Sequence, residues 1–232
     1  MTTTLSTANL RKTARLTGVL YFIFALLGTY TFFYVQPRVF TNGDAVATAQ
    51  NMLAHESLLR VGTACGIITN FMFVVIVLLF YKIFCQVNAF LAKLMVGFVL
   101  VALPVALLGD VLELTALSIF KGNVLKTVQL DEHAQFLAMA FLKIRSISGQ
   151  LLTFFWGIWL FPLGWLAYRS GFIPRIFGVL LLINGVGYLV QCFTFILFPE
   201  SLQAVIKMIF PIYFTGEIPF IFWLLIKGVR GV

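Results

Sequence analysis

Charged residues are scarce in this sequence. Asp, Glu, Lys and Arg make up 10% of the 232 residues, whereas 61% of the residues are hydrophobic. A soluble domain of this length needs many more polar residues, because its charged side chains face water. The composition therefore excludes a soluble globular protein, and we expect one transmembrane domain over residues 1–232 with no second large domain beside it.

Histidine and cysteine are equally sparse. His55 and His133 are far apart, and Cys65, Cys85 and Cys192 are scattered through apolar stretches. An intramembrane zinc enzyme needs clustered ligands such as H-E-x-x-H, and a disulfide framework needs an even set of cysteines. The sequence also lacks the G-x-S-x-G, Walker A and dinucleotide-binding glycine motifs. We expect no metal site; no cofactor is indicated, and an enzyme would have to use carboxylates alone.

Long apolar runs are what the sequence does contain. A bilayer is crossed by about 20 helical residues at about 1.5 Å rise each. Six runs meet this length, near 16–36, 59–81, 94–119, 147–168, 176–198 and 208–227. They predict an all-α integral membrane bundle of six helices, whose main partner is the lipid bilayer.

The net charge of +8 is spread over the segments between these runs. It forms no basic patch on a soluble module, so no nucleic acid is expected as a partner. With the N-terminus inside, nine Lys and Arg fall on the inner side and seven on the outer side, and no acid falls on the inner side. This bias predicts that both termini are cytoplasmic. The first run lacks an A-x-A cleavage site after it, which indicates a retained span rather than a signal peptide.

The residue patterns of two outer segments predict helices rather than loops. Asp44 is placed as the N-cap of a short interfacial helix, with Val46, Ala49 and Leu53 on its apolar face. The helical pattern also extends ahead of the fourth span. A single helix from 132 to 168 would be about 55 Å long, which exceeds the hydrocarbon core of about 30 Å. We therefore expect a bend near Ser146–Gly149 or a helix that projects outward.

Glu217 is the most unusual residue of the last span. A carboxylate at the bilayer centre costs about 2.5–3.5 kcal/mol on insertion scales, so ionisable groups at this depth are candidates for function. Gly216 allows a neighbouring backbone to approach, and Pro219 frees the carbonyl of Thr215 and predicts a kink. Two interpretations remain: a ligand or proton site, and a protonated glutamate that holds the bundle together by hydrogen bonds to Asn70 or another span.

Asp110 and Glu113 form a second candidate. Their i, i+3 spacing places them on one helix face, where two ionised carboxylates repel each other. We expect at least one to be protonated, metal-bound or paired with a cation, and Arg145 is the counter-charge we predict. Either an ordinary ion pair or a functional carboxylate site fits this pattern. The candidate set of polar residues within the spans, with this arginine, is Glu217, Asp110, Glu113, Arg145, Asn70, Gln150 and Gln191.

The C-terminal half carries a longer pattern. The segments "GWLAYRSGFIPRIFGVLLLINGVGYLV", "LFPE" and "TGEIPFIFWLLIKGV", with the looser "ARLTGVLY", "NGDAVATAQN" and "ESLLRVG", resemble bacterial membrane proteins known as domain of unknown function 4386. The resemblance covers nearly the whole chain. It implies a six-helix protein of the bacterial cytoplasmic membrane in which Glu217 belongs to the family pattern. Members often carry a His near the position of Ser146 and an Arg in the third span, and this chain has neither.

These observations favour a non-enzymatic membrane protein. Its function would be to bind a small molecule, a lipid or a proton in an outward-facing polar crevice. Glu217 would lie at midplane, with Asp110 and Glu113 at the mouth. An intramembrane enzyme that uses paired carboxylates, or a structural or accessory subunit, are the alternatives.

Overall fold

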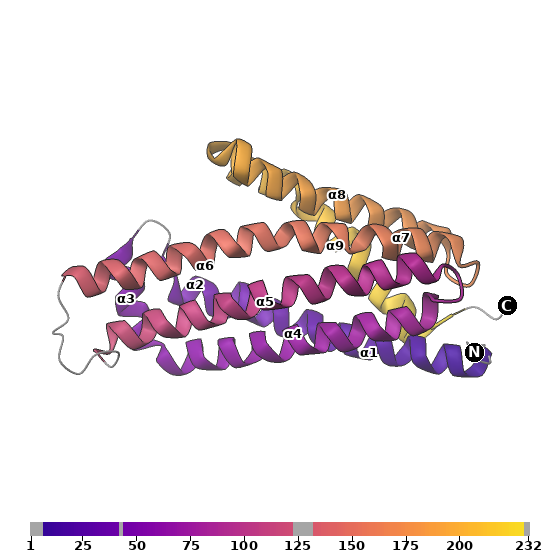
Figure 1. The fold of residues 1–232 in the computed structure, drawn as a ribbon, viewed down its shortest axis with the longest axis horizontal. Coiled ribbons are helices and arrows are strands. Elements are labelled where there is room, and N and C mark those ends of the chain that lie inside the picture. Colours follow the sequence, from indigo (N-terminus) through magenta and orange to yellow (C-terminus); the bar gives the residue numbers. More distant parts are fainter. Residues whose placement is uncertain (1–6, 42–43, 123–131, 230–232) are drawn as a thin grey trace. The chain divides into compact units, whose positions relative to one another are not determined.

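A computed structural model describes residues 7–41, 44–122 and 132–229 (Figure 1). The elements follow in the order α1 (Thr7–Tyr30), the π-helical turn η1 (Thr31–Val35), α2 (Gln36–Val39), α3 (Ala45–Ala54), α4 (Glu56–Phe84), α5 (Ala89–Phe120), α6 (Glu132–Ile158), α7 (Leu160–Arg169), α8 (Arg175–Leu197), the short 3-10 helix η2 (Pro199–Ser201) and α9 (Leu202–Ile226). The described residues contain no strand. The all-α fold predicted from the sequence is confirmed.

Within the described residues, six helical segments are long and apolar enough to cross a membrane. They are Ala8–Val39, Glu56–Phe84, Ala89–Phe120, His133–Arg169, Arg175–Leu197 and Pro199–Ile226. Each contains most of one predicted span and generally extends it at one or both ends. The helices run beyond the apolar runs because helix geometry continues through polar flanking residues, which hydropathy alone does not mark.

The break in the fourth segment differs from the prediction. α6 continues unbroken through Ser146–Gly149, and the helix is interrupted at Trp159, between Ile158 and Leu160. Pro162 is the physical reason, because proline lacks an N–H group and its ring clashes with the carbonyl of the residue four positions earlier, which is Ile158.

α3 begins at the N-cap that the sequence predicted. The side chain of Asp44 accepts a hydrogen bond of 2.8 Å from the backbone N–H of Ala47, as expected for an N-cap. The buried side chains of α3 are Thr48 and Met52, whereas Val46 is 64% exposed. Of the expected apolar face, Ala49 packs against a hydrophobic core cluster and Leu53 is 43% exposed, so the placement of this face in the membrane interface stays a prediction.

The chain forms two compact units, and α1, α4, α5 and α6 contribute residues to both. The first unit comprises Met1–Ile23, Met72–Ala102 and Gln150–Val232, and the second comprises Phe24–Phe71 and Leu103–Gly149. The sequence predicts that the two units belong to one transmembrane domain, and this stays a prediction. Each unit is described by itself below.

In the first unit, α7 packs on α8 and α8 packs on α9. The contact between α7 and α8 is a close approach of backbones. A Cβ built on Gly178 would lie 2.6 Å from the carbonyl oxygen of Gly164, and one built on Gly164 would lie 2.8 Å from that of Gly178. Small residues at such crossings are how membrane helices gain packing contacts.

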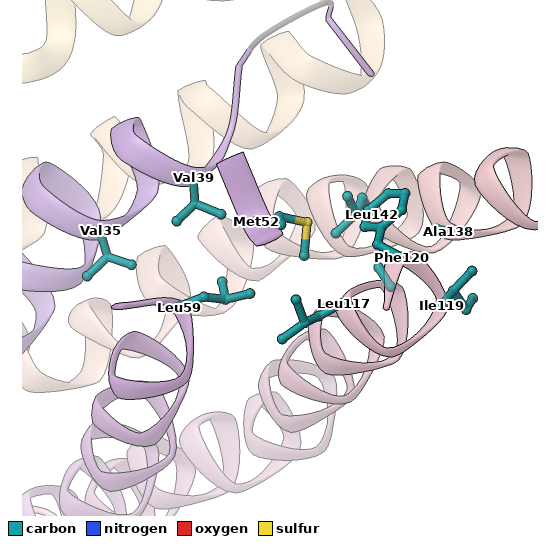
Figure 2. Close-up of a cluster of buried hydrophobic side chains, with 10 residues drawn as sticks. Val35, Val39, Met52, Leu59, Leu117, Ile119, Phe120, Ala138 and Leu142 are labelled. Atoms are coloured by element: carbon teal, nitrogen blue, oxygen red, sulfur yellow. The ribbon is translucent and has the colours of Figure 1, made fainter. Parts of the chain in front are cut away.

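The second unit has a hydrophobic core of its own. Side chains from η1, α2, α3, α4, α5 and α6 meet there, and Met52 of α3 lies between Val39, Leu59 and Leu117 (Figure 2). Met52 and Leu59 are completely buried. The short helix α3 is therefore anchored through its methionine, which fills irregular gaps well because its side chain is unbranched and flexible.

Candidate functional site

Glu217 is held by hydrogen bonds from two other helices. Its Oε1 accepts from the hydroxyl of Tyr21 on α1. Its Oε2 accepts from Nδ2 of Asn184 at 2.9 Å and from the hydroxyl of Tyr188 at 3.4 Å, both on α8. All four residues belong to the first unit. We call them the Glu217 cluster.

The glycine before Glu217 brings α9 onto α8. A Cβ added to Gly216 would lie 2.8 Å from the carbonyl oxygen of Leu180 and 2.9 Å from Cβ of Asn184. Any larger residue would push the two helices apart, so glycine sets the distance at which Asn184 reaches the carboxylate. α9 remains helical through Pro219, where the sequence predicted a kink.

One polar atom of Asn184 has no hydrogen-bond partner among the described residues. The residue is completely buried, and the unpartnered atom is Oδ1. A buried acceptor without a donor is costly, and such exceptions call for an explanation. The Glu217 cluster therefore contains a buried oxygen that can accept one more hydrogen bond.

A row of polar side chains adjoins the cluster on one side. The ring of Tyr213 stacks on that of Tyr188 with centroids 4.6 Å apart. The Tyr213 hydroxyl donates to Oε1 of Gln191, whose Nε2 donates to Oε1 of Gln150 at 3.1 Å. Tyr188 and Gln191 on α8 and Tyr213 on α9 lie between Glu217 and the α8–α9 connection, and Gln150 joins them from α6. We call Tyr188, Tyr213, Gln191 and Gln150 the polar track.

Aromatic side chains pack on the other side of the Glu217 cluster. The Tyr21 ring meets Phe80 and Trp159 edge-on, at 6.0 and 6.3 Å between centroids. Phe80 stacks on Phe220 at 5.8 Å and on Phe84 at 6.1 Å. We call Phe80, Phe84, Trp159 and Phe220 the aromatic plug; each is at most 2% exposed. Phe220 follows Glu217 toward the C-terminal end of α9, so the plug lies opposite the polar track.

A second polar group lies in the second unit. The guanidinium of Arg145 pairs with Oε2 of Glu113, whose Oε1 accepts a hydrogen bond of 3.0 Å from Thr63. Arg145 also lies over the ring of Phe40, with its guanidinium carbon 4.8 Å from the ring centre. Oδ2 of Asp110 is buried and has no hydrogen-bond partner within the part of the chain that the structure describes.

The structure thus divides the predicted candidates into two groups. Glu217, Gln150 and Gln191 lie in the first unit. Asp110, Glu113, Arg145 and Asn70 lie in the second unit. Asn70 was suggested as a partner for Glu217, but the partners of Glu217 come from α1 and α8 instead.

Five partners are absent from the candidate set predicted from the sequence, namely Tyr21, Asn184, Tyr188, Tyr213 and Thr63. The signal for Tyr188 was present, because it follows Asn184 by four residues and so shares its helix face. Tyr21 gave no local signal, since it lies 196 residues from Glu217 in the sequence. No group of three His, Cys, Asp or Glu that could hold a metal ion is found among the described residues.

Comparisons with known proteins identify a family for this chain. The model of a domain of unknown function (DUF4386) matches residues 16–228. An uncharacterized protein from Archaeoglobus fulgidus is 36% identical over 101 residues, which are 41% of this chain and 59% of the relative, so the match spans less than two thirds of the relative's length. No solved structure matches the chain. Because this relative is archaeal, the bacterial source expected from the sequence stays a prediction.

Proposed function

The chain belongs to the family of the domain of unknown function DUF4386, and from this premise we propose that it is a multi-pass membrane protein that binds and releases a proton at Glu217. One observation carries the proposal: a carboxylate within an apolar helix receives hydrogen bonds from Tyr21, Asn184 and Tyr188. Intramembrane carboxylates held in this way are typical of proton-binding sites in membrane proteins.

A proton suits this site better than a larger ligand. Three donors already surround the Glu217 carboxylate, so a small molecule would have to displace them, whereas a proton needs no cavity. Protonation turns one carboxylate oxygen into a donor. The unpartnered Oδ1 of Asn184 is an acceptor in the same cluster, and a protonated Glu217 would supply the donor that it lacks.

The surroundings of Glu217 favour access from one side of the membrane. Tyr188, Tyr213, Gln191 and Gln150 offer hydrogen-bonding groups toward the α8–α9 connection. On the opposite side, the aromatic plug offers only the indole N–H of Trp159, because phenylalanine rings carry no N–H or O–H group. With both termini cytoplasmic, as the charge distribution predicts, the accessible side is the outer one. Asp110 and Glu113 belong to the second unit, so their role as the mouth of this site stays a prediction.

Infrared spectroscopy of the protein in lipid tests the proposal directly. A protonated carboxyl has a C=O stretching band that an ionised carboxylate lacks. We expect this band to change with pH in the wild type, and the part of that change that belongs to Glu217 to be missing from the difference spectrum of Glu217→Gln. Glu200→Gln is the matched control, because Glu200 is an exposed glutamate in the same unit. A Glu217→Gln spectrum with the same pH-dependent change as the wild type would refute the proposal.

A structural role is the second candidate, and the same hydrogen bonds favour it. They join α9 to α1 and α8, and such bonds are worth about 0.6–2 kcal/mol each between membrane helices. In that case Glu217→Gln would melt early at every pH, with no infrared change attributable to the carboxyl. An enzyme that uses paired carboxylates has less support, because Glu113 is already engaged by Arg145 and Thr63.

A further inference from the structure

One end of the first unit carries only basic charged side chains. It is the end at which α1, α5 and α8 begin and α4, α7 and α9 finish. No Asp or Glu lies at this end among the described residues. We call it the basic end, and its exposed cations are Arg11, Lys12, Arg15, Lys82, Lys93, Arg169, Arg175 and Lys227.

Contacts between the helix ends hold these cations on one surface. Phe84 at the end of α4 stacks on Phe172 in the α7–α8 turn, with centroids 5.9 Å apart. Arg15 of α1 donates a hydrogen bond of 3.1 Å to the carbonyl of Ile226, in the last turn of α9. The cations therefore share one end of the unit with no carboxylate among the described residues there, and an anion from outside the protein would be attracted to it.

Arg169 and Arg175 are the best organised members of the basic end. They flank the α7–α8 turn, and each lies over an aromatic ring. The guanidinium carbon of Arg169 is 5.9 Å from the ring centre of Trp165, and that of Arg175 is 5.5 Å from the ring centre of Tyr168. Such stacking holds a guanidinium in place and leaves the N–H groups at its edge free to donate.

The neighbouring aromatics place this turn at the membrane surface. Trp165 is 49% exposed although it belongs to a membrane-crossing segment. Trp and Tyr side chains concentrate at the level of the lipid headgroups, because their rings are apolar and their polar atoms need water or headgroups. Arg169 and Arg175 therefore stand at the depth of lipid phosphates.

We propose that Arg169 and Arg175 bind the phosphate of an anionic phospholipid headgroup. The planar guanidinium matches the oxygens of a phosphate in a two-pronged arrangement, which lysine does not provide. The lipid is anionic rather than zwitterionic, because a choline headgroup brings a cation that the other basic residues of this end repel. This proposal is independent of proton binding at Glu217.

Lipid titration of the purified full chain in detergent tests it. The melting temperature is followed while phosphatidylglycerol or phosphatidylcholine with the same acyl chains is added. We expect the wild type to bind phosphatidylglycerol more tightly. Arg169→Gln with Arg175→Gln should weaken that binding about 25-fold, or roughly fivefold per residue, which corresponds to about 1 kcal/mol per cation.

The matched control is Lys143→Gln with Lys207→Gln, which removes two exposed positive charges outside the basic end. Its affinity for phosphatidylglycerol should stay at the wild-type value. The proposal is overturned if the wild type binds both lipids equally, if the control loses as much affinity as the arginine variant, or if inorganic phosphate stabilises the protein as well as phosphatidylglycerol does.

A second variant keeps the test valid if the first variant misfolds. Arg169→Lys with Arg175→Lys keeps both charges but removes the planar guanidinium groups, and we expect it to lose a measurable part of the affinity. If this lysine variant binds phosphatidylglycerol as tightly as the wild type, bulk charge is the cause and the assignment to these two arginines is wrong.

Discussion

The hydroxyl of Tyr21 donates a hydrogen bond to Oε1 of Glu217 across 196 residues of sequence. This bond joins α1 to α9, and Asn184 and Tyr188 join the same carboxylate to α8. Three helices of the first unit therefore meet at one side chain. The predictions below separate what this arrangement contributes to stability from what it contributes to function.

Removing the Tyr21 hydroxyl should weaken the first unit. We expect Tyr21→Phe to lower the free energy of unfolding by about 0.6–2 kcal/mol, the usual contribution of a hydrogen bond between membrane helices. Denaturant unfolding in detergent measures the change. Tyr81→Phe is the control, because no hydrogen bond of the Tyr81 hydroxyl is found within the described residues. Equal losses in both variants would show that the bond to Glu217 contributes nothing specific.

The close approach of α8 and α9 predicts a sharp difference between two glycines. Gly216→Ala should destabilise the protein by about 1–3 kcal/mol, the range for overpacking a tight contact. Gly97→Ala should be neutral or stabilising by up to about 1 kcal/mol, because its added Cβ meets nothing within 4 Å and alanine favours a helix. Thermal unfolding of both variants checks the pair. A Gly216→Ala protein as stable as Gly97→Ala would contradict the backbone contact.

The ion pair of the second unit should matter far more than the ion pair near the surface. Glu113 has a side chain only 6% exposed, so Arg145→Met leaves an uncompensated charge and should cost about 3–5 kcal/mol. Lys121→Met removes an exposed partner of Glu56 and should cost at most about 1 kcal/mol.

A double variant completes this test. Arg145→Met with Glu113→Gln should be less destabilised than Arg145→Met alone, because the unpaired carboxylate is gone. A double variant that is worse than either single change would mean that the two residues act independently.

Labelling with a membrane-impermeant thiol reagent tests the orientation. In a chain whose Cys65 and Cys192 are replaced by Ala, the native Cys85 lies in the α4–α5 turn at the basic end. Ser201→Cys places a thiol at the α8–α9 connection instead. We expect intact cells to be labelled at position 201, with Cys85 reacting only after permeabilisation, because basic ends face the cytoplasm. The reverse pattern would invert the proposed side of access to Glu217.

Much of the fold was predictable because its signals are local. A run of about 20 apolar residues must be helical in a bilayer, since every backbone polar group must be satisfied within the segment. Asp44 was placed correctly as a cap because an N-cap bond joins residues only three apart. Of the two alternatives for the long fourth segment, the bend near Ser146–Gly149 is not found because α6 is continuous there, and the helix that projects outward stays a prediction.

The contacts of the polar residues were harder to predict from the sequence. The i, i+3 spacing of Asp110 and Glu113 was visible, and Arg145 was named as their counter-charge. Which carboxylate the arginine contacts depends on how α5 and α6 pack, and the structure places it against Glu113. The interpretation of one crevice shared by Glu217 and Asp110 stays a prediction, because the two residues belong to different units.

The sequence by itself determined that this is a helical membrane protein with a carboxylate buried in its last span. Hydropathy and helix periodicity are properties of neighbouring residues, so no knowledge of the rest of the chain was needed. Only the tertiary structure decided what Glu217 touches. Tyr21 and Asn184 reach it from helices 196 and 33 residues away, and Gly216 permits the close packing that brings Asn184 into range. Such contacts arise from how side chains interlock between helices, which the order of residues along one helix does not specify.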